Sequence, residues 1–190
     1  GIACTVTTAK ASYRLMTASP GGFMIYPMAM AAAIGEALGL TGEEIAAGVA
    51  AYVPTGSRMH IIRLPEGRLL IDDCYNANPQ AMTEALRLLA VTQTRRRAAV
   101  LGDMGELGEL TVSAHRAIGA LTGELHLDSV IAIGEKARDI ASAAPNAQWF
   151  PSVEDALPAV RAAFTGGTAM LVKASHAMHF ENIVKELEQS

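Results

Sequence analysis

The segment Arg68-Leu69-Leu70-Ile71-Asp72-Asp73-Cys74-Tyr75-Asn76-Ala77-Asn78-Pro79 runs from an apolar stretch through polar residues into a helix start. Its apolar part is typical of a buried strand, and Asn78 before Pro79 is a good N-cap followed by a proline at the first helical position. Open α/β sheets bind ligands between the end of a strand and the start of a helix. We therefore predict a strand, a helix and a candidate site between them.

The same alternation continues to the end of the chain. Strands are expected over 60–64, 68–72, 98–101, 129–133 and 169–173, and helices over 79–92, 110–122, 136–143, 153–164 and 178–188. This alternation is the pattern of a parallel sheet covered by helices on both faces. The predicted fold class is α/β, with a doubly wound, mostly parallel sheet.

The first part of the chain has a different pattern. Weak alternation near the start predicts one or two short strands, and two apolar helices follow, the first opened by Pro27 and the second by a capping box at Thr41 and Glu44. Pro54-Thr55-Gly56-Ser57 is typical of a linker. We expect a domain fragment over 1–54 and a complete domain over 55–190.

The composition excludes several classes of protein. The chain has 190 residues, of which 51% are apolar and 18% charged, so it is not disordered. The net charge is −4 and Arg95-Arg96-Arg97 is the only cationic run, which argues against nucleic-acid binding. The longest apolar stretch, Phe23–Ile34, is too short to span a bilayer.

The two cysteines and the first residue indicate the context of the chain. Cys4 and Cys74 form neither a disulfide framework nor a zinc-ligand spacing, which favours a reducing cytoplasm. Cys74 follows Asp72 and Asp73, whose charges disfavour the thiolate, so we expect no nucleophile there. Because the chain begins with Gly1, without a signal peptide, we expect a piece of a longer protein.

Two of the expected strand ends carry acidic side chains. Asp73 has oxygens to accept hydrogen bonds from ribose hydroxyls, and Tyr75 offers a ring face to a base. In Gly102-Asp103-Met104-Gly105-Glu106-Leu107-Gly108, the two carboxylates suit an amine or a hydrated cation. Structural alternatives stay open, since Asn78 is explained as a cap and the glycines as turns. His115 is expected at the surface or as a capping residue.

The end of the last strand and the linker supply the remaining candidates. Lys173 suits a carboxylate or phosphate, and Ser175 suits a helix cap. His176 and His179 are three residues apart but lack a third ligand, so no metal site is expected. Arg58 follows the linker, where a hinge would bring it toward another domain.

Three motifs, Asp72–Pro79, Gly102–Gly108 and Leu171–Ser175, occur in an order and spacing that resembles the Mur ligase family, in the branch that adds D-alanyl-D-alanine. The resemblance covers residues 54–190 strongly. Residues 1–53 look like the last strands and helices of the family's central ATPase domain. The implied fold is a Rossmann-like carboxyl-terminal domain preceded by part of an α/β ATPase domain.

The resemblance implies an ATP-dependent ligase that forms an amide bond. In that family ATP with Mg²⁺ phosphorylates the carboxylate of UDP-MurNAc-tripeptide, and the amine of D-Ala-D-Ala attacks the acyl phosphate. The implied partners are these two substrates and the N-terminal and central domains, in the cytoplasm, without nucleic acid or membrane insertion. GxxxxGK[ST] occurs nowhere in the sequence, so ATP and Mg²⁺ are expected mainly on the missing domain and the fragment is expected to be inactive alone.

The resemblance also implies roles for individual residues. The expected nucleotide contacts are made by Arg58 at the ATP phosphates, Asp73 at the ribose, and Tyr75, Asn76 and Asn78 beside the nucleotide. The positions expected near the incoming substrates are Asp103, Glu106, Lys173 and Ser175. No catalytic residue and no metal ligand is assigned within the chain.

The sequence departs from the family pattern at several positions, and other functions stay open. Phe23 and Pro27 stand where nucleotide-facing polar groups are expected, and Ala174 and His176 replace a common Gly and Arg. The alternative function is a non-catalytic α/β module that binds a nucleotide or dipeptide. A folate- or glutamate-adding ligase of the same superfamily is a weaker alternative, because the Tyr-Asn-Ala-Asn-Pro wording fits the dipeptide-adding branch better.

Overall fold

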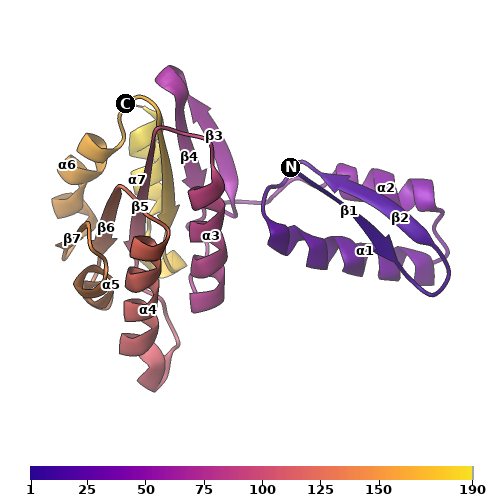
Figure 1. Cartoon of the computed structure of the whole chain (residues 1–190), viewed down its shortest axis with the longest axis horizontal. Coiled ribbons are helices and arrows are strands. Elements are labelled where there is room, and N and C mark those ends of the chain that lie inside the picture. Colours follow the sequence, from indigo (N-terminus) through magenta and orange to yellow (C-terminus); the bar gives the residue numbers. More distant parts are fainter. Residues whose placement is uncertain (190) are drawn as a thin grey trace. The chain divides into compact units, whose positions relative to one another are not determined.

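The computed structural model describes residues 1–189 and divides into two compact units, an amino-terminal unit, Gly1–Thr55, and a carboxyl-terminal unit that begins at Gly56 (Figure 1). Ser190, the last residue of the expected second domain, lies outside the described residues. Each unit has its own cluster of buried apolar side chains. The two units are therefore described separately.

The amino-terminal unit is an antiparallel hairpin packed against two helices. Its elements are β1 (Ile2–Thr7), β2 (Ser12–Thr17), α1 (Ile25–Ala37) and α2 (Gly42–Ala50). The predicted capping box is confirmed, because Thr41 Oγ1 accepts a hydrogen bond from the Glu44 backbone and the Glu44 carboxylate accepts one from Thr41 N. Helix α1 begins two residues before Pro27, where the sequence predicted its start.

The carboxyl-terminal unit is built on a six-stranded sheet with the strand order β3-β4-β8-β5-β6-β7. The strands are β3 (His60–Leu64), β4 (Arg68–Asp72), β5 (Arg96–Gly102), β6 (Ser129–Ile133), β7 (Ala147–Phe150) and β8 (Thr168–Lys173). Only β3 pairs antiparallel, with β4, and the other neighbours are parallel. The predicted α/β class with a mostly parallel sheet is confirmed.

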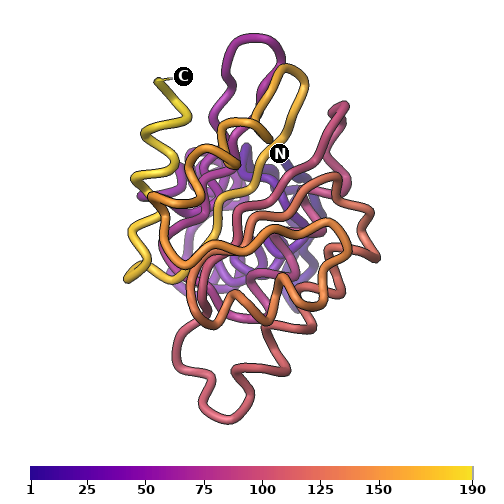
Figure 2. The backbone as a smooth tube through the Cα atoms, turned by 90° about the vertical axis from the view of Figure 1, so that its left-hand side faces the viewer, coloured from indigo at the N-terminus to yellow at the C-terminus, as the bar shows by residue number. Residues whose placement is uncertain are grey.

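Helices cover both faces of this sheet (Figures 1 and 2). They are α3 (Pro79–Val91), α4 (Thr111–Glu124), α5 (Arg138–Ala143), α6 (Val153–Ala163) and α7 (Glu181–Glu188). Alternate strand residues such as Val100 and Val172 pack in one core with α6 and α7, whereas α3, α4 and α5 lie on the opposite face. Strand β8 is buried along its whole length, as expected between two parallel neighbours.

Two elements differ from the sequence prediction. Strand β7 was not predicted, because it is a four-residue edge strand with two exposed side chains and little alternation. The expected helix from Met178 begins instead at Glu181, after a 3₁₀ turn over His176–Met178 and a left-handed His179 with φ of 52°. Within residues 1–189, no helix is long and apolar enough to span a membrane.

Candidate functional site

The carboxyl ends of β4, β8 and β5 lie side by side, because these strands are consecutive neighbours in the sheet and run in the same direction. The three segments singled out in the sequence follow these strand ends, so the topology brings them together. This edge is where doubly wound sheets bind ligands. The candidate site is described below from its buried base outward.

A buried ion pair joins the ends of β4 and β8. The Lys173 ammonium lies 2.5 Å from Asp73 Oδ2 and donates a second hydrogen bond to the Asn76 carbonyl at 2.8 Å. The Lys173 side chain is 2% exposed and that of Asp73 is 14% exposed. A buried ammonium needs this compensation, since an unpaired charge there carries a large desolvation cost.

The residues after the linker are bonded to the same strand end. Asp73 Oδ1 accepts a hydrogen bond from Met59 N at 2.9 Å, and Tyr75 N donates one to the Ser57 carbonyl at 3.1 Å. Between these contacts, the Arg58 guanidinium carbon lies 3.8 Å from the centre of the Tyr75 ring. This is a cation–π contact between two exposed side chains at the mouth of the site.

The His176 ring also lies close to the Tyr75 ring. Its ring centre is 5.6 Å from that of Tyr75, with a tilt of 31° between the planes, and 6.2 Å from that of His179. His176 thus brings an imidazole ring close to the pair formed by Tyr75 and Arg58. In residues 1–189, no three His, Cys, Asp or Glu side chains gather into a possible metal site.

Asp103 joins three loops at the sheet edge. Its Oδ1 accepts a hydrogen bond from Ala137 N at 2.8 Å, and its carbonyl accepts one from Ser175 N at 3.1 Å. The Ser175 hydroxyl accepts a further hydrogen bond from Gly105 N at 3.0 Å. A Cβ at Gly134, where φ is 110°, would stand 2.6 Å from Asp103 Oδ1, so the arrangement requires glycine there.

His115 is buried, and its predicted position at the surface is wrong. Its side chain is fully enclosed, with Nε2 accepting a hydrogen bond from Met104 N at 3.0 Å. Because Nε2 accepts, Nδ1 carries the proton and donates to the Thr111 carbonyl at 2.7 Å. The neutral imidazole thus holds the loop that carries Asp103 and Glu106, a role hidden in the sequence because the contact links residues eleven apart.

The two asparagines make local contacts. Asn78 Oδ1 accepts a hydrogen bond from Ala81 N at 2.8 Å, which makes it the N-cap of α3, with Pro79 in the first turn. Asn76 Oδ1 accepts one from Ala77 N at 2.8 Å, and its carbonyl receives the Lys173 ammonium. Glu106, with φ of 58°, is exposed on its loop.

Cys74 is a buried thiol beneath the site. Burial raises its pKa first, and the Asp72 carboxylate raises it further by charge repulsion and by a hydrogen bond. The expectation that Cys74 is no nucleophile follows from the same charges, but burial, which the sequence did not reveal, is the larger cause. Cys4 and Cys74 are both free thiols.

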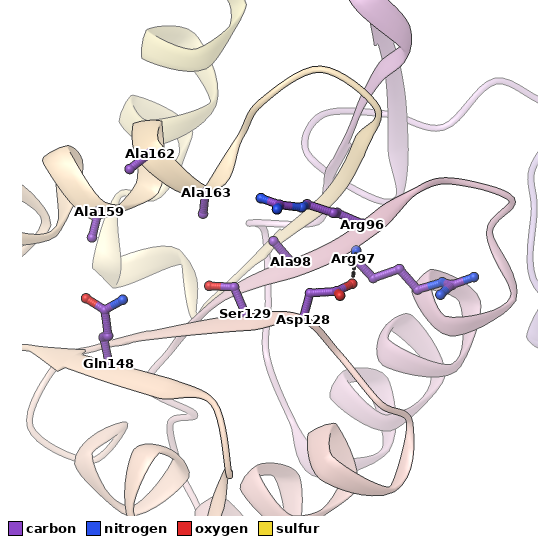
Figure 3. Close-up of a pocket in the computed structure, with 9 residues that line it drawn as sticks. All are labelled: Arg96, Arg97, Ala98, Asp128, Ser129, Gln148, Ala159, Ala162 and Ala163. Atoms are coloured by element: carbon purple, nitrogen blue, oxygen red, sulfur yellow. Dashed lines mark hydrogen bonds between the residues drawn. The ribbon is translucent and has the colours of Figure 1, made fainter.

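Two of the hollows on this unit lie at opposite ends of the parallel strands. A groove of about 510 Å³ lies on the carboxyl edge between the start of α6 and the 3₁₀ turn, lined among others by Ser152, Glu154, Met178, His179 and Asn182. A cavity of about 480 Å³ lies at the amino ends of β5 and β6, where Arg96 points toward the alanines of α6 (Figure 3). Of these two hollows, the groove is on the carboxyl edge, where the sequence motifs gather.

Residues 57–176 match the family model described as Mur ligase, glutamate ligase domain. The UDP-N-acetylmuramoyl-tripeptide–D-alanyl-D-alanine ligase of Bacillus subtilis is 34% identical over 170 residues, covering 85% of this chain and 37% of that protein. The enzyme of the same name from Escherichia coli is 29% identical over 192 residues, covering 100% of this chain and 42% of its own length.

Solved structures agree with these relatives. A crystal structure of MurF from Acinetobacter baumannii has a TM-score of 0.89 and 27% identity, covering 99% of this chain and 42% of that one. MurF from Thermotoga maritima in complex with ADP has a TM-score of 0.79 at 23% identity, which shows a shared fold. The chain spans about two fifths of the length of these proteins. It belongs to the Mur ligase family, and its similarity to MurF enzymes extends across both of its units.

Proposed function

We propose that the chain is the carboxyl-terminal part of a cytoplasmic, ATP-dependent ligase that joins D-Ala-D-Ala to UDP-MurNAc-tripeptide in peptidoglycan precursor synthesis. The observation that carries the proposal is the gathering of the three motifs at one sheet edge, in a chain whose curated relatives bear the name of that ligase. The two free cysteines agree with a reducing compartment. The partners in the reaction are the two substrates and the amino-terminal remainder of the protein.

In the proposed reaction, ATP supplies the phosphoryl group that activates the tripeptide carboxylate as an acyl phosphate. The dipeptide amine then attacks the acyl carbon, and inorganic phosphate leaves as the amide bond forms. We assign Arg58, which is exposed over the Tyr75 ring, to the phosphates, and Asp73 to the ribose, since each of its oxygens keeps a lone pair for a ribose hydroxyl. These side chains bind and orient, which is the main contribution of a protein to phosphoryl transfer.

On the acceptor side, we assign binding to the carboxyl edge around Glu106 and the adjoining groove. Glu106 is exposed and carries the negative charge that suits a dipeptide ammonium, whereas Asp103 and Ser175 already hold the loops of this edge together. The groove, at about 510 Å³, has room for a dipeptide. As the family resemblance implies, Mg²⁺ is assigned to the remainder of the protein together with the loop that holds the ATP phosphates, and the chain alone is expected to be inactive.

A chimera tests the proposal directly. Residues 57–189 replace the aligned part of the Bacillus subtilis relative, and ADP release is measured with UDP-MurNAc-tripeptide and D-Ala-D-Ala. We expect ADP release that depends on the dipeptide, a loss of at least tenfold in kcat/KM on Arg58→Ala, and no change on Lys185→Met, an exposed position in α7. A folded chimera that binds ATP but never releases ADP would favour a non-catalytic binding module instead.

A further inference from the structure

The buried ammonium of Lys173 has no direct path to a ligand. Its side chain is 2% exposed, and two of its three N–H groups donate to Asp73 and to the Asn76 carbonyl. The resemblance to the family placed this lysine beside the incoming substrates. Its contacts instead point inward, beneath the segment that follows β4.

The Asp73 carboxylate also binds the residues that follow the linker. Its Oδ2 receives the Lys173 ammonium and its Oδ1 receives the Met59 backbone N–H at 2.9 Å. Asp73 is itself fixed to β8, because its backbone N donates to the Val172 carbonyl at 3.0 Å. One carboxylate therefore connects the central strand β8 with Met59.

Met59 needs such an anchor. Its backbone is left-handed, with φ of 51°, a conformation that a non-glycine residue adopts only when surrounding contacts hold it. On the other side of Arg58, the Ser57 carbonyl accepts the Tyr75 N–H. Ser57 and Met59, the two chain neighbours of Arg58, are thus each fixed by a hydrogen bond. The Arg58 guanidinium lies over the Tyr75 ring.

We propose that Lys173 is a positioning residue that acts through Asp73 and Met59 to hold Arg58 over Tyr75, facing the nucleotide. The part of this inference that concerns the nucleotide rests on the proposed function, whereas the coupling between Lys173 and Arg58 does not. The two contacts of the Asp73 carboxylate, with Lys173 and with Met59 N, give the buried lysine a structural role beside the proposed ribose site.

The coupling is tested in the 190-residue chain by amide hydrogen exchange and by the chemical shifts of Arg58. Lys173→Met keeps the length of the side chain and removes its charge, so the Asp73 carboxylate is expected to turn toward water and release Met59 N. We expect exchange at Met59 to accelerate at least tenfold relative to Ile71 in β4, and the upfield ring-current shift of the Arg58 δ-protons to disappear. Lys185→Met is the matched control and leaves both signals unchanged.

Equal acceleration at Met59 and Ile71 would show general destabilisation and overturn the proposal, as would an unchanged Arg58 shift. If Lys173→Met does not fold, Asp73→Ala gives the Met59 readout, since it removes the carboxylate that accepts the hydrogen bonds of both Met59 N and the ammonium.

A double-mutant cycle tests the nucleotide part with ATP and MgCl₂ as the probe. In the chimera with the Bacillus subtilis relative, we expect Lys173→Met to weaken ATP binding at least tenfold, and clearly less in the Arg58→Ala background, where only the proposed contact of Asp73 with the ribose is left to lose. Additive losses would overturn positioning through Arg58. If the folded chimera binds no ATP, the proposed nucleotide site is wrong, and the exchange experiment still decides the coupling.

Discussion

At the scale of single residues, the site is held by contacts that carry no sequence motif of their own. Gly134 was not singled out in the sequence, yet its missing side chain leaves the space in which the Asp103 carboxylate meets Ala137 N. His115 likewise acts through two hydrogen bonds with the backbone, and Met59 through the one that its N–H donates to Asp73. Residue chemistry at strand ends was predictable, but the residues that fix it depend on distances across the fold.

Gly134→Ala is expected to destabilise the carboxyl-terminal unit. The new Cβ would stand 2.6 Å from Asp103 Oδ1 at a φ of 110°, so the cost is roughly 1–3 kcal/mol. Urea unfolding followed by circular dichroism measures this cost. Gly105→Ala is the control, because its Cβ would meet only Ser175 Oγ at 3.6 Å, an ordinary contact, and a change beyond about 0.5 kcal/mol is not expected. Equal effects of the two substitutions would contradict the argument.

At the scale of helices and strands, agreement with the sequence follows periodicity and caps. Strands β3, β4 and β6 have the predicted bounds, because apolar runs ended by turn residues define them. Edge strand β7 was missed, since a short edge strand has no such run. The junctions around the site were also displaced: His179, left-handed at φ of 52°, separates the 3₁₀ turn from α7, and nothing in a histidine predicts that conformation.

Substitutions of Asn78, the N-cap of α3, distinguish its structural role from the nucleotide contact expected of it. Asn78→Ala removes the oxygen that accepts the Ala81 N–H and is expected to cost about 1 kcal/mol of unfolding free energy. Asn78→Ser restores an acceptor and most of that stability, which urea unfolding of both variants measures. If the nucleotide contact proposed for Asn78 exists as well, the serine variant regains stability but not ATP affinity. A stable alanine variant would show that the cap contributes nothing.

Acid sensitivity of the amino-terminal unit is expected to centre on Glu36. The hydrogen bond from Thr8 Oγ1 lowers the pKa of this carboxyl most, followed by the bond from the Tyr13 hydroxyl. A lowered pKa means that the ionised form stabilises the fold above the ordinary glutamate pKa of about 4.3, and that this contribution is lost as the pH falls through the lowered value.

Glu36→Gln should therefore lower the thermal midpoint of this unit at pH 7, and the difference from wild type should shrink as the pH falls below 4. Calorimetry across that range measures the difference. The matched control is Glu43→Gln, an exposed carboxyl in the first turn of α2. A gap between wild type and Glu36→Gln that stays constant with pH would refute the assignment.

At the scale of the whole chain, the two units differ in how completely they cover their apolar surface. The sheet of the carboxyl-terminal unit has helices on both faces and a core that includes Phe180 and Leu187. In the amino-terminal unit, α1 is apolar except for Glu36 and packs one side, through Met28 and Ala32, into the core formed with the hairpin and α2. A helix with so little polar surface is normally buried on all sides. This contrast fits the prediction that residues 1–54 are a fragment of a larger domain, in a chain that spans about two fifths of the length of its relatives.

The uncovered face of α1 gives the last prediction. Tyr26, Met30, Ile34 and Leu38 recur every fourth residue and are 75%, 63%, 57% and 74% exposed, so they form one apolar stripe. Exposed stripes of this kind promote association, and we expect Met30→Glu with Ile34→Lys to raise the concentration at which the chain aggregates, without lowering its unfolding free energy by more than about 0.5 kcal/mol. Static light scattering and urea unfolding measure the two quantities.

Met28→Lys, at a position 2% exposed on the opposite side of α1, is the contrasting variant and should unfold the unit. Aggregation at an unchanged concentration would mean that the stripe is not the surface through which the isolated chain associates, because Met30→Glu and Ile34→Lys remove its two central side chains.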